Sequence, residues 1–128
     1  MVEEQYTSFE VAKLLKEKGF NESCRYYYVN NGNLMFTEEY LHNSEIKYGT
    51  YSSCVCTAPT QQMAMAWLRE IHNIHIDICS IWDVIHWLYQ VFVITPRTAR
   101  NSYVDKILYT SYEQAVEAGI KYCLENLI

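Results

Sequence analysis

The order of apolar and polar residues along the chain predicts three amphipathic helices. The first helix begins at Thr7 or Ser8, and the stretch TSFE gives it a capping box that is completed by Glu10. Gly19 suits the left-handed position that follows the end of a helix. The apolar stripe of this helix consists of Val11, Ala12, Leu14 and Leu15. The stripe predicts that the helix buries one face.

The second helix spans residues 58–73, with Pro59 in its first turn, and the third helix begins at Ser111. Gly119 lowers the stability of the third helix by about 1 kcal/mol relative to Ala, and close packing on a sheet would explain its presence. The predicted buried stripes are Met63, Ala64, Trp67, Leu68 and Ile71 in the second helix, and Tyr112, Ala115, Val116, Gly119 and Cys123 in the third.

Runs of aromatic and β-branched residues predict the strands. A hairpin is predicted where CRYYYV and LMF flank NNGN, because Asn and Gly tolerate positive φ. We expect a long loop over residues 37–50 and an open loop over the segment TPRTARNS. The remaining strands are predicted in TYSSCVCT, IHIDICSI, HWLYQVFVIT and DKILY.

These elements predict an α+β fold that forms a single domain over residues 1–128. The strands have few connections long enough to cross over a sheet, which favours antiparallel pairing. We therefore expect a mainly antiparallel sheet of about five strands, with three helices packed on one face.

Composition and charge exclude several classes of protein. Half of the 128 residues are hydrophobic, and 15 acids against 10 bases give a net charge of −5, which disfavours binding to phosphate backbones. The N-terminal stretch MVEEQYTSFE has acids where a signal peptide needs bases, and the longest apolar run is too short to span a membrane. The number of cysteines, five, is odd, which is unusual for a disulfide scaffold. We expect a cytoplasmic protein with reduced thiols and no membrane contact.

The segment HNIHIDICS concentrates side chains that can bind metals. His75, Asp77 and Cys79 share one face of the predicted strand, and His72 precedes it, so the four could approach one metal ion. A half-exposed antiparallel strand also alternates apolar and polar residues by default, and no second ligand pair of matching spacing occurs. We therefore expect Ile74, Ile76 and Ile78 to point inward, with no metal, no cofactor and no catalytic residue assigned.

Two further chemistries are weaker alternatives. Cys54 and Cys56 form C-x-C rather than a redox C-x-x-C motif, and no phosphate-binding glycine motif or nucleophile elbow is present. A weak nucleic-acid site could combine Arg25 and the adjacent tyrosines with the loop over residues 97–106, although core packing also explains the tyrosines.

Three segments together resemble a known family. They are FEVAKLLKEKGF (9–20), APTQQMAMAWLREIHNIHI (58–76) and SYEQAVEAGIKYCLENLI (111–128), which cover somewhat under half of the chain. They resemble small uncharacterised proteins from prophages and mobile elements of gut Bacteroidetes. The resemblance implies a mobile-element origin, and it implies no activity and no catalytic residues. The strands in the middle of the chain and the region 37–57 lie outside it.

The sequence favours a non-enzymatic accessory protein of a phage or mobile element that acts through protein–protein contacts. The alternatives are a small metal-binding protein or hydrolase-like enzyme using the segment His72–Cys79, and a weak nucleic-acid binder. One sheet face should carry His75, Asp77 and Cys79 beside one of two sets from the next strand, led by His86 or by Trp87. Either set is apolar, so we expect a second copy, as in a homodimer, or another protein to cover this face.

Overall fold

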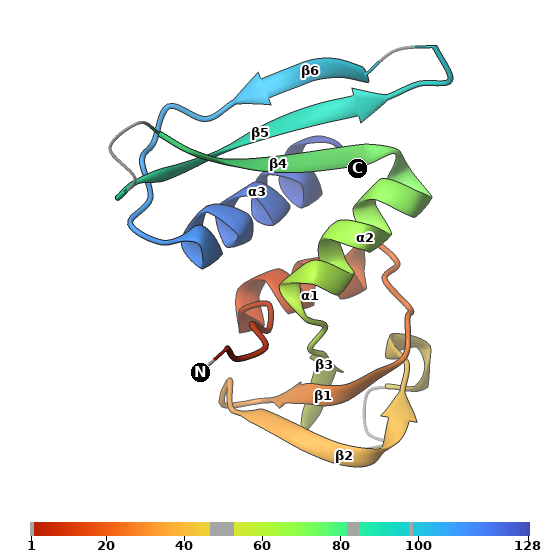
Figure 1. Ribbon diagram of the computed structural model, residues 1–128. Helices are drawn as coiled ribbons and strands as arrows, with labels where there is room; N and C mark the ends of the chain where they lie inside the picture. The colour runs from red at the N-terminus through yellow and green to blue at the C-terminus, as the bar shows by residue number, and fades with distance from the viewer. Residues whose placement is uncertain (1, 47–52, 82–84, 98) are drawn as a thin grey trace. The chain divides into compact units, whose positions relative to one another are not determined.

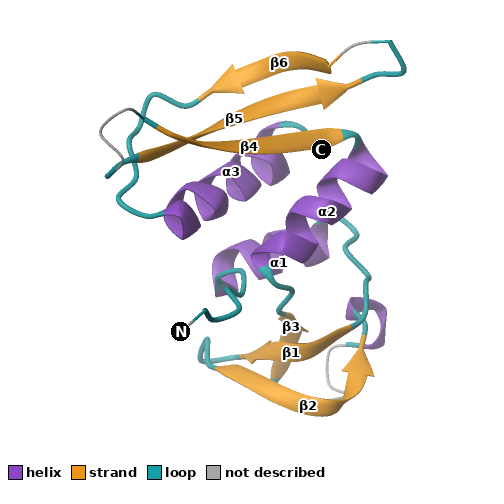
Figure 2. Cartoon of the chain, viewed as in Figure 1, coloured by secondary structure: helices purple, strands orange, loops and turns teal. Residues whose placement is uncertain are grey.

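The computed structural model describes residues 2–46, 53–81, 85–97 and 99–128 of the chain (Figure 1). Figure 2 shows helices and strands distributed along the whole described chain. In order, the elements are α1 (Phe9–Glu17), β1 (Cys24–Val29), β2 (Leu34–Leu41), the 3₁₀ helix η1 (Asn43–Glu45), β3 (Cys54–Thr57), α2 (Gln61–His72), β4 (Ile74–Ser80), β5 (Trp87–Ile94), β6 (Ala99–Val104) and α3 (Tyr112–Asn126).

The described strands form two antiparallel sheets of three, ordered β2-β1-β3 and β4-β5-β6. The α+β class and the antiparallel pairing are confirmed, and six strands are close to the five expected. The strands form two sheets instead of the single sheet that was expected. The sequence could not reveal this division, because an alternating pattern identifies a buried face but does not identify the neighbouring strand. The contacts within the chain correspondingly gather in two compact units, Met1–Thr60 and Gln61–Ile128. The single domain over residues 1–128 stays a prediction, which an equilibrium unfolding curve would test.

The first unit begins with α1, which is capped by the second of the two expected residues. The Ser8 hydroxyl accepts a hydrogen bond from the Val11 amide at 3.2 Å. Thr7 is buried instead, and its hydroxyl donates to the Pro59 carbonyl at 3.0 Å, so the expected capping box from Thr7 is wrong. Gly19 ends the helix with φ +94°, as predicted. On the buried face of α1, Ala12 packs in a core cluster with Tyr28, Cys56 and Ala58.

The hairpin of β1 and β2 turns at the predicted NNGN stretch, where Gly32 has φ +84°. The expectation of a long loop over residues 37–50 is wrong in its first part, because β2 continues to Leu41 and η1 follows. Most of β2 is exposed, so this strand lacks the apolar alternation that reveals a half-buried strand. The predicted strand TYSSCVCT corresponds to β3, and its first residues lie outside the described chain.

In the second unit, α2 and α3 lie on the same side of the sheet (Figure 1). The buried residues of α2 are Gln61, Ala64, Met65, Trp67 and Leu68, so the expected stripe is correct for only three positions. Ile71 is 58% exposed and Met63 is also exposed, whereas Gln61 is buried and its side chain donates to the Glu113 carbonyl at 3.0 Å. Because α3 accepts this hydrogen bond from the Gln61 side-chain amide, a polar residue can be buried here. Pro59 precedes the helix and is not part of its first turn.

The long hairpin of β4 and β5 follows the predicted alternation. Ile74 and Ile76 are buried, Ile78 is half-buried, and Asn73 ends α2 with φ 57°. The last strand was expected in DKILY, but β6 begins inside the segment expected to be an open loop and ends at Val104, before DKILY. DKILY contributes only an isolated bridge between Tyr109 and Trp87. The edge strand β6 is rich in polar residues, which explains why its sequence predicted a loop.

Candidate interaction surface

The face of the second sheet that points away from α2 and α3 is the surface that the sequence analysis singled out. The pairing of β4 with β5 places His75 opposite Phe92, Asp77 opposite Gln90 and Cys79 opposite Leu88. Opposed residues in an antiparallel pair point to the same side, so the structure selects the first of the two sets left open by the sequence. We define the outer face as the described side chains of His75, Asp77, Cys79, Leu88, Gln90, Phe92, Ile94 and Val104.

In the second unit, α2 and α3 pack on the opposite face of this sheet (Figure 1). An ideal Cβ at Gly119 of α3 would lie 3.0 Å from Ile76 and 3.2 Å from Tyr89, whose side chains belong to the inner face. Val104 is 46% exposed, and most of the other outer-face side chains are half-buried by their neighbours. Among the described side chains on this face, Asp77 is the only carboxylate, and there is no lysine or arginine.

Polar groups on the outer face satisfy one another. The Cys79 thiol donates to Asp77 at 3.3 Å, and the Gln90 amide donates to the Cys79 sulfur at 3.1 Å. Partial burial raises the pKa of the Cys79 thiol, and Asp77 raises it further. An open hollow beside this chain of hydrogen bonds is lined by His75, Asp77, Phe92 and Ile94. The outer face therefore combines apolar area with a few fixed polar groups, a composition typical of protein interfaces.

The four residues considered as a metal cradle are not brought together. The His72 ring packs against Trp67 with ring centroids 4.6 Å apart, and its Nε2 atom is buried without a hydrogen-bond partner in the described structure. His75 lies beside Phe92, with ring centroids 6.4 Å apart. Within the described ranges, no three His, Cys, Asp or Glu side chains are close enough to hold one metal ion. The segment His72–Cys79 thus divides its polar groups between a helix end and a sheet face.

None of the five thiols has the lowered pKa that a cysteine nucleophile needs. Burial raises the pKa of Cys24 to about 11, and it raises the pKa of Cys56 and of Cys123 to about 12. The pKa of Cys54 is also raised by burial, although the nearby Lys16 opposes this effect. Cys54 is half-buried and Cys56 is fully buried, and both are free thiols.

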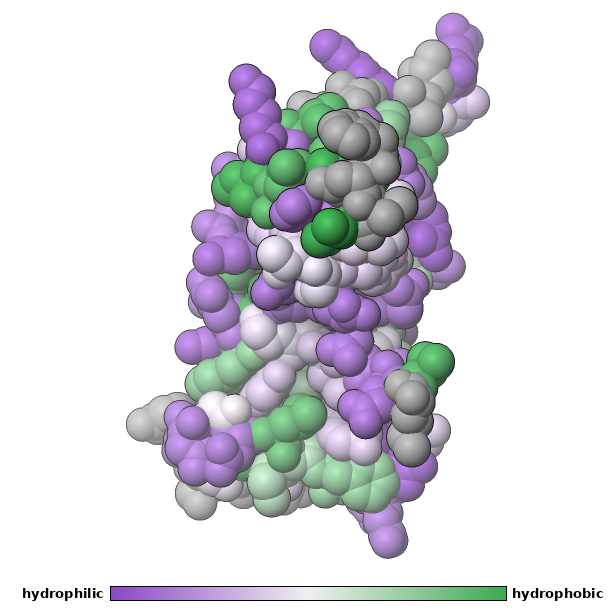
Figure 3. Space-filling view, turned by 60° about the vertical axis from the view of Figure 1, so that its left-hand side comes forward, coloured by the Kyte–Doolittle hydropathy of each residue, from purple (hydrophilic) through white to green (hydrophobic). Residues whose placement is uncertain are grey.

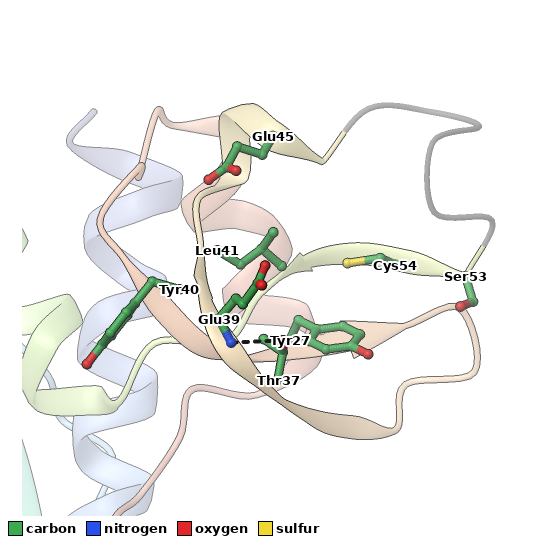
Figure 4. Close-up of a pocket in the computed structure, with 8 residues that line it drawn as sticks. All are labelled: Tyr27, Thr37, Glu39, Tyr40, Leu41, Glu45, Ser53 and Cys54. Carbon is green, nitrogen blue, oxygen red and sulfur yellow. Dashed lines mark hydrogen bonds between the residues drawn. The ribbon is translucent and has the colours of Figure 1, made fainter.

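The first unit carries a cavity of about 220 Å³ that the sequence did not predict. It is lined by Tyr27, Thr37, Glu39, Tyr40, Leu41, Glu45, Ser53 and Cys54. Figure 4 shows Glu39, Leu41 and Cys54 pointing toward this space, while the ring of Tyr40 turns to the other side of β2. The cavity could not be found from the sequence, because several of its residues belong to a segment that was expected to be a loop.

The polar groups around this cavity are poorly suited to catalysis. The Glu45 carboxylate pairs with the His42 ring at 2.7 Å, and His42 lowers the pKa of Glu45 through this hydrogen bond. The Cys54 thiol has a raised pKa, and no histidine is among the lining residues. Among the described residues that line the cavity, there is therefore no paired nucleophile and base.

One of the three tyrosines of β1, Tyr28, belongs to the core and is not available to nucleic-acid bases. Tyr28 is buried and packs against Phe9, with ring centroids 5.2 Å apart. The Arg25 guanidinium donates to the Glu38 carbonyl at 3.0 Å and lies over the rings of Phe36 and Tyr40. Arg97, Arg100 and Lys106, which were considered together with Arg25, belong to the other compact unit.

A polar cluster around Asp105 in the second unit was not predicted from the sequence. Asp105 is only 5% exposed, and its carboxylate accepts hydrogen bonds from the Tyr109 hydroxyl at 2.7 Å and the Tyr103 hydroxyl at 3.4 Å. Tyr103 stacks on Tyr122 with ring centroids 4.0 Å apart. Burial and the Asp105 charge raise the pKa of Tyr109. The cluster is a satisfied buried network that fixes the end of β6 to α3.

The aromatic residues near the hairpin of β4 and β5 are turned back onto α3. Tyr89 is buried, and the Trp87 ring meets Tyr112 edge-on with ring centroids 5.5 Å apart. Trp82, between β4 and β5, lies outside the described residues. Figure 3 shows one face of the molecule, on which hydrophobic side chains form small patches separated by hydrophilic ones.

Comparison with protein-family models, with curated proteins and with solved structures finds no match for this chain. Among the described helices, none is both long and apolar enough to cross a membrane.

Proposed function

We propose that this chain is a non-enzymatic accessory protein that acts through protein–protein contacts, and that the outer face of the second sheet is the contact surface. The observation that carries this proposal is that the described helices of the second unit, α2 and α3, pack on one side of its sheet (Figure 1). Its other side combines Leu88, Phe92, Ile94 and Val104 with a hollow beside Asp77. Apolar area of this kind is stabilised when a partner removes it from water. An origin in a phage or mobile element, suggested by the resemblance, is part of the same proposal.

A second exposed apolar surface lies on β2 and is less suited to a partner. Leu34, Phe36 and Tyr40 are exposed there, but Glu38 lies between Phe36 and Tyr40 in the strand. Arg25 covers the rings of Phe36 and Tyr40. A partner would have to displace or desolvate these charges, which costs free energy. The outer face of the second sheet requires the desolvation of only one carboxylate.

Site-specific photo-crosslinking in cells that carry the gene naturally tests the proposal. A benzophenone amino acid in place of Phe92 should give a covalent protein adduct, since the position lies on the proposed contact surface. The matched control replaces Glu113, which is exposed in the first turn of α3, and should give no adduct. A third position, Phe36, reports on the alternative surface of β2.

Each outcome of this experiment decides the proposal. Adducts at position 92 but not at position 113 support it. Adducts at position 36 alone would move the contact to the first sheet and overturn the assigned surface. The absence of adducts at both aromatic positions would overturn the interaction function.

A further inference from the structure

The free edge of β4 differs from the other sheet edges. Over seven residues, β4 pairs with β5 without a register shift, and β5 is its only strand partner among the described residues. The pairing of β2 and that of β6 are each interrupted by an irregularity, and β3 has only four residues. Bulges, charges and short length are the usual means of preventing edge-to-edge pairing, and β4 has only Asp77. This edge is therefore a suitable template for another strand.

The backbone of β4 shows which residues would bond to that strand. The Ile94 amide donates to the Asn73 carbonyl at 2.8 Å, and the Ile81 amide donates to the His86 carbonyl at 3.2 Å. Hydrogen-bonded pairs alternate along an antiparallel ladder, so the odd-numbered residues of β4 direct their backbone groups toward β5. The N–H and C=O groups of Ile74, Ile76 and Ile78 consequently point to the free edge.

This direction limits the ways in which two copies of β4 can pair. In a symmetric antiparallel pair, residues whose backbone groups point to the free edge must face other such residues. The two-fold axis therefore passes between one residue and the same residue of the other copy. An axis at Asp77 pairs the whole strand, but it places two carboxylates in a non-hydrogen-bonded pair, with Cα atoms about 4.5 Å apart. An axis at Ile78 leaves Asp77 facing Cys79.

With the axis at Ile76, the two polar residues His75 and Asp77 face each other across the seam. His75 of each copy faces Asp77 of the other, and this contact occurs twice. The imidazole can donate a hydrogen bond to the carboxylate in either protonation state, so the arrangement does not require a charged histidine. On the inner face, Ile74 faces Ile78 and Ile76 faces its own copy, which gives a continuous isoleucine row.

We propose that two copies of this chain pair through the free edges of β4, with the two-fold axis at Ile76, and join their second sheets into one antiparallel sheet of six strands. The inference deepens the proposed function and rests on it, because the joined sheet doubles the outer face offered to a partner.

The position of α2 supports this arrangement. α2 contacts β4, whereas α3 contacts both β4 and β5, so α2 is the helix nearer to the free edge. Opposed residues of an antiparallel pair point to the same side, so pairing brings the α2 helices of the two copies to the same side of the joined sheet.

Directed disulfide formation tests the register. One preparation carries His75→Cys and a second carries Asp77→Cys, both with Cys79→Ser to remove the neighbouring thiol. The two positions face each other at about 4.5 Å between Cα atoms, within the range of a disulfide. When the preparations are mixed and oxidised, a 75–77 disulfide should appear in the mixture and be absent from each preparation alone. The second His75–Asp77 contact remains intact in that heterodimer.

The controls separate this inference from random collision and from the proposed function. A Glu113→Cys variant mixed with the Asp77→Cys variant should give no disulfide, since position 113 lies on α3. Disulfides from the Asp77→Cys variant alone would place the axis at Asp77 and overturn the proposed register. A mass that stays at 15.1 kDa in light scattering, without any disulfide, would overturn the self-pairing. Protein adducts at position 92 would then still support the proposed function with a different partner.

Discussion

Replacing Gly119 with alanine should destabilise the protein, although alanine is the better helix former. α3 crosses the second sheet at this glycine. An ideal Cβ there would lie 3.0 Å from Ile76 Cγ2, 3.2 Å from Tyr89 Cγ and 3.3 Å from Tyr89 Cδ2. Ordinary contacts between carbon atoms are about 3.5–4.0 Å long. The added methyl group would therefore push the helix away from the sheet or displace two buried side chains.

The magnitude follows from two opposed effects. Alanine in place of glycine inside a helix contributes about 1 kcal/mol of stability. Insertion of a methyl group into a packed core costs about 1–3 kcal/mol. The upper part of that range applies here, because Ile76 Cγ2 and Tyr89 Cγ lie close to their own backbones and cannot swing aside. The net loss of unfolding free energy should be about 1–2 kcal/mol.

Urea unfolding of the Gly119→Ala variant and its parent measures this loss. The matched control is Ala118→Gly, one position earlier on a half-buried part of α3, which should lose only the helix propensity of about 1 kcal/mol. In an Ile76→Ala background the Gly119→Ala change should cost less, since the nearest obstructing atom is absent. A Gly119→Ala protein that is as stable as its parent, or more stable, would refute the close packing of α3 on the sheet.

Three further outcomes are expected. Trp67 is 6% exposed on α2, so Trp67→Ala should cost about 3–5 kcal/mol, and coincident urea curves for variant and parent would contradict this burial. Asp105→Ala leaves the hydroxyl of the half-buried Tyr109 without its acceptor and should cost about 1–3 kcal/mol. The loss should shrink when Tyr109→Phe is already present, and full additivity of the two losses would contradict the hydrogen bond. Alkylation of the native protein should modify the half-buried Cys54 and Cys79 first, and only above the pH at which an ordinary thiol reacts, because both pKa values are raised. Faster modification of the buried Cys56, followed by peptide mass spectrometry, would contradict the assigned burial.

The sequence predicted those elements whose residues alternate between water and a core. The strand from Ile74, the cap at Ser8 or Thr7 and the close packing at Gly119 all followed from local chemistry. The second half of β2 and the whole of β6 were missed. Each of these strands forms a sheet edge that is exposed or polar, so their sequences carry no periodic signal.

The candidate surface could be predicted in part. Alternation placed His75, Asp77 and Cys79 on one face, but the sequence could not decide which residues of β5 accompany them. That choice depends on the register, which pairs His75 with Phe92 and is fixed by the turn and the core. The Asp105 cluster was invisible for a related reason. It joins side chains from β6, from the segment after β6 and from α3, and only the folded chain brings them together.

Light scattering across a dilution series, applied to three forms of the protein, tests the pairing of two copies through β4. The Ile78 amide points to the free edge of β4, so Ile78→Pro removes a donor needed for pairing between copies while leaving the ladder with β5 intact. Ile78→Val is the matched control. If two copies pair through β4, the parent and Ile78→Val should show about twice the mass of 15.1 kDa, and a folded Ile78→Pro protein should show the single mass. A parent protein that remains at the single mass, or a folded Ile78→Pro protein that still doubles, would contradict pairing through β4.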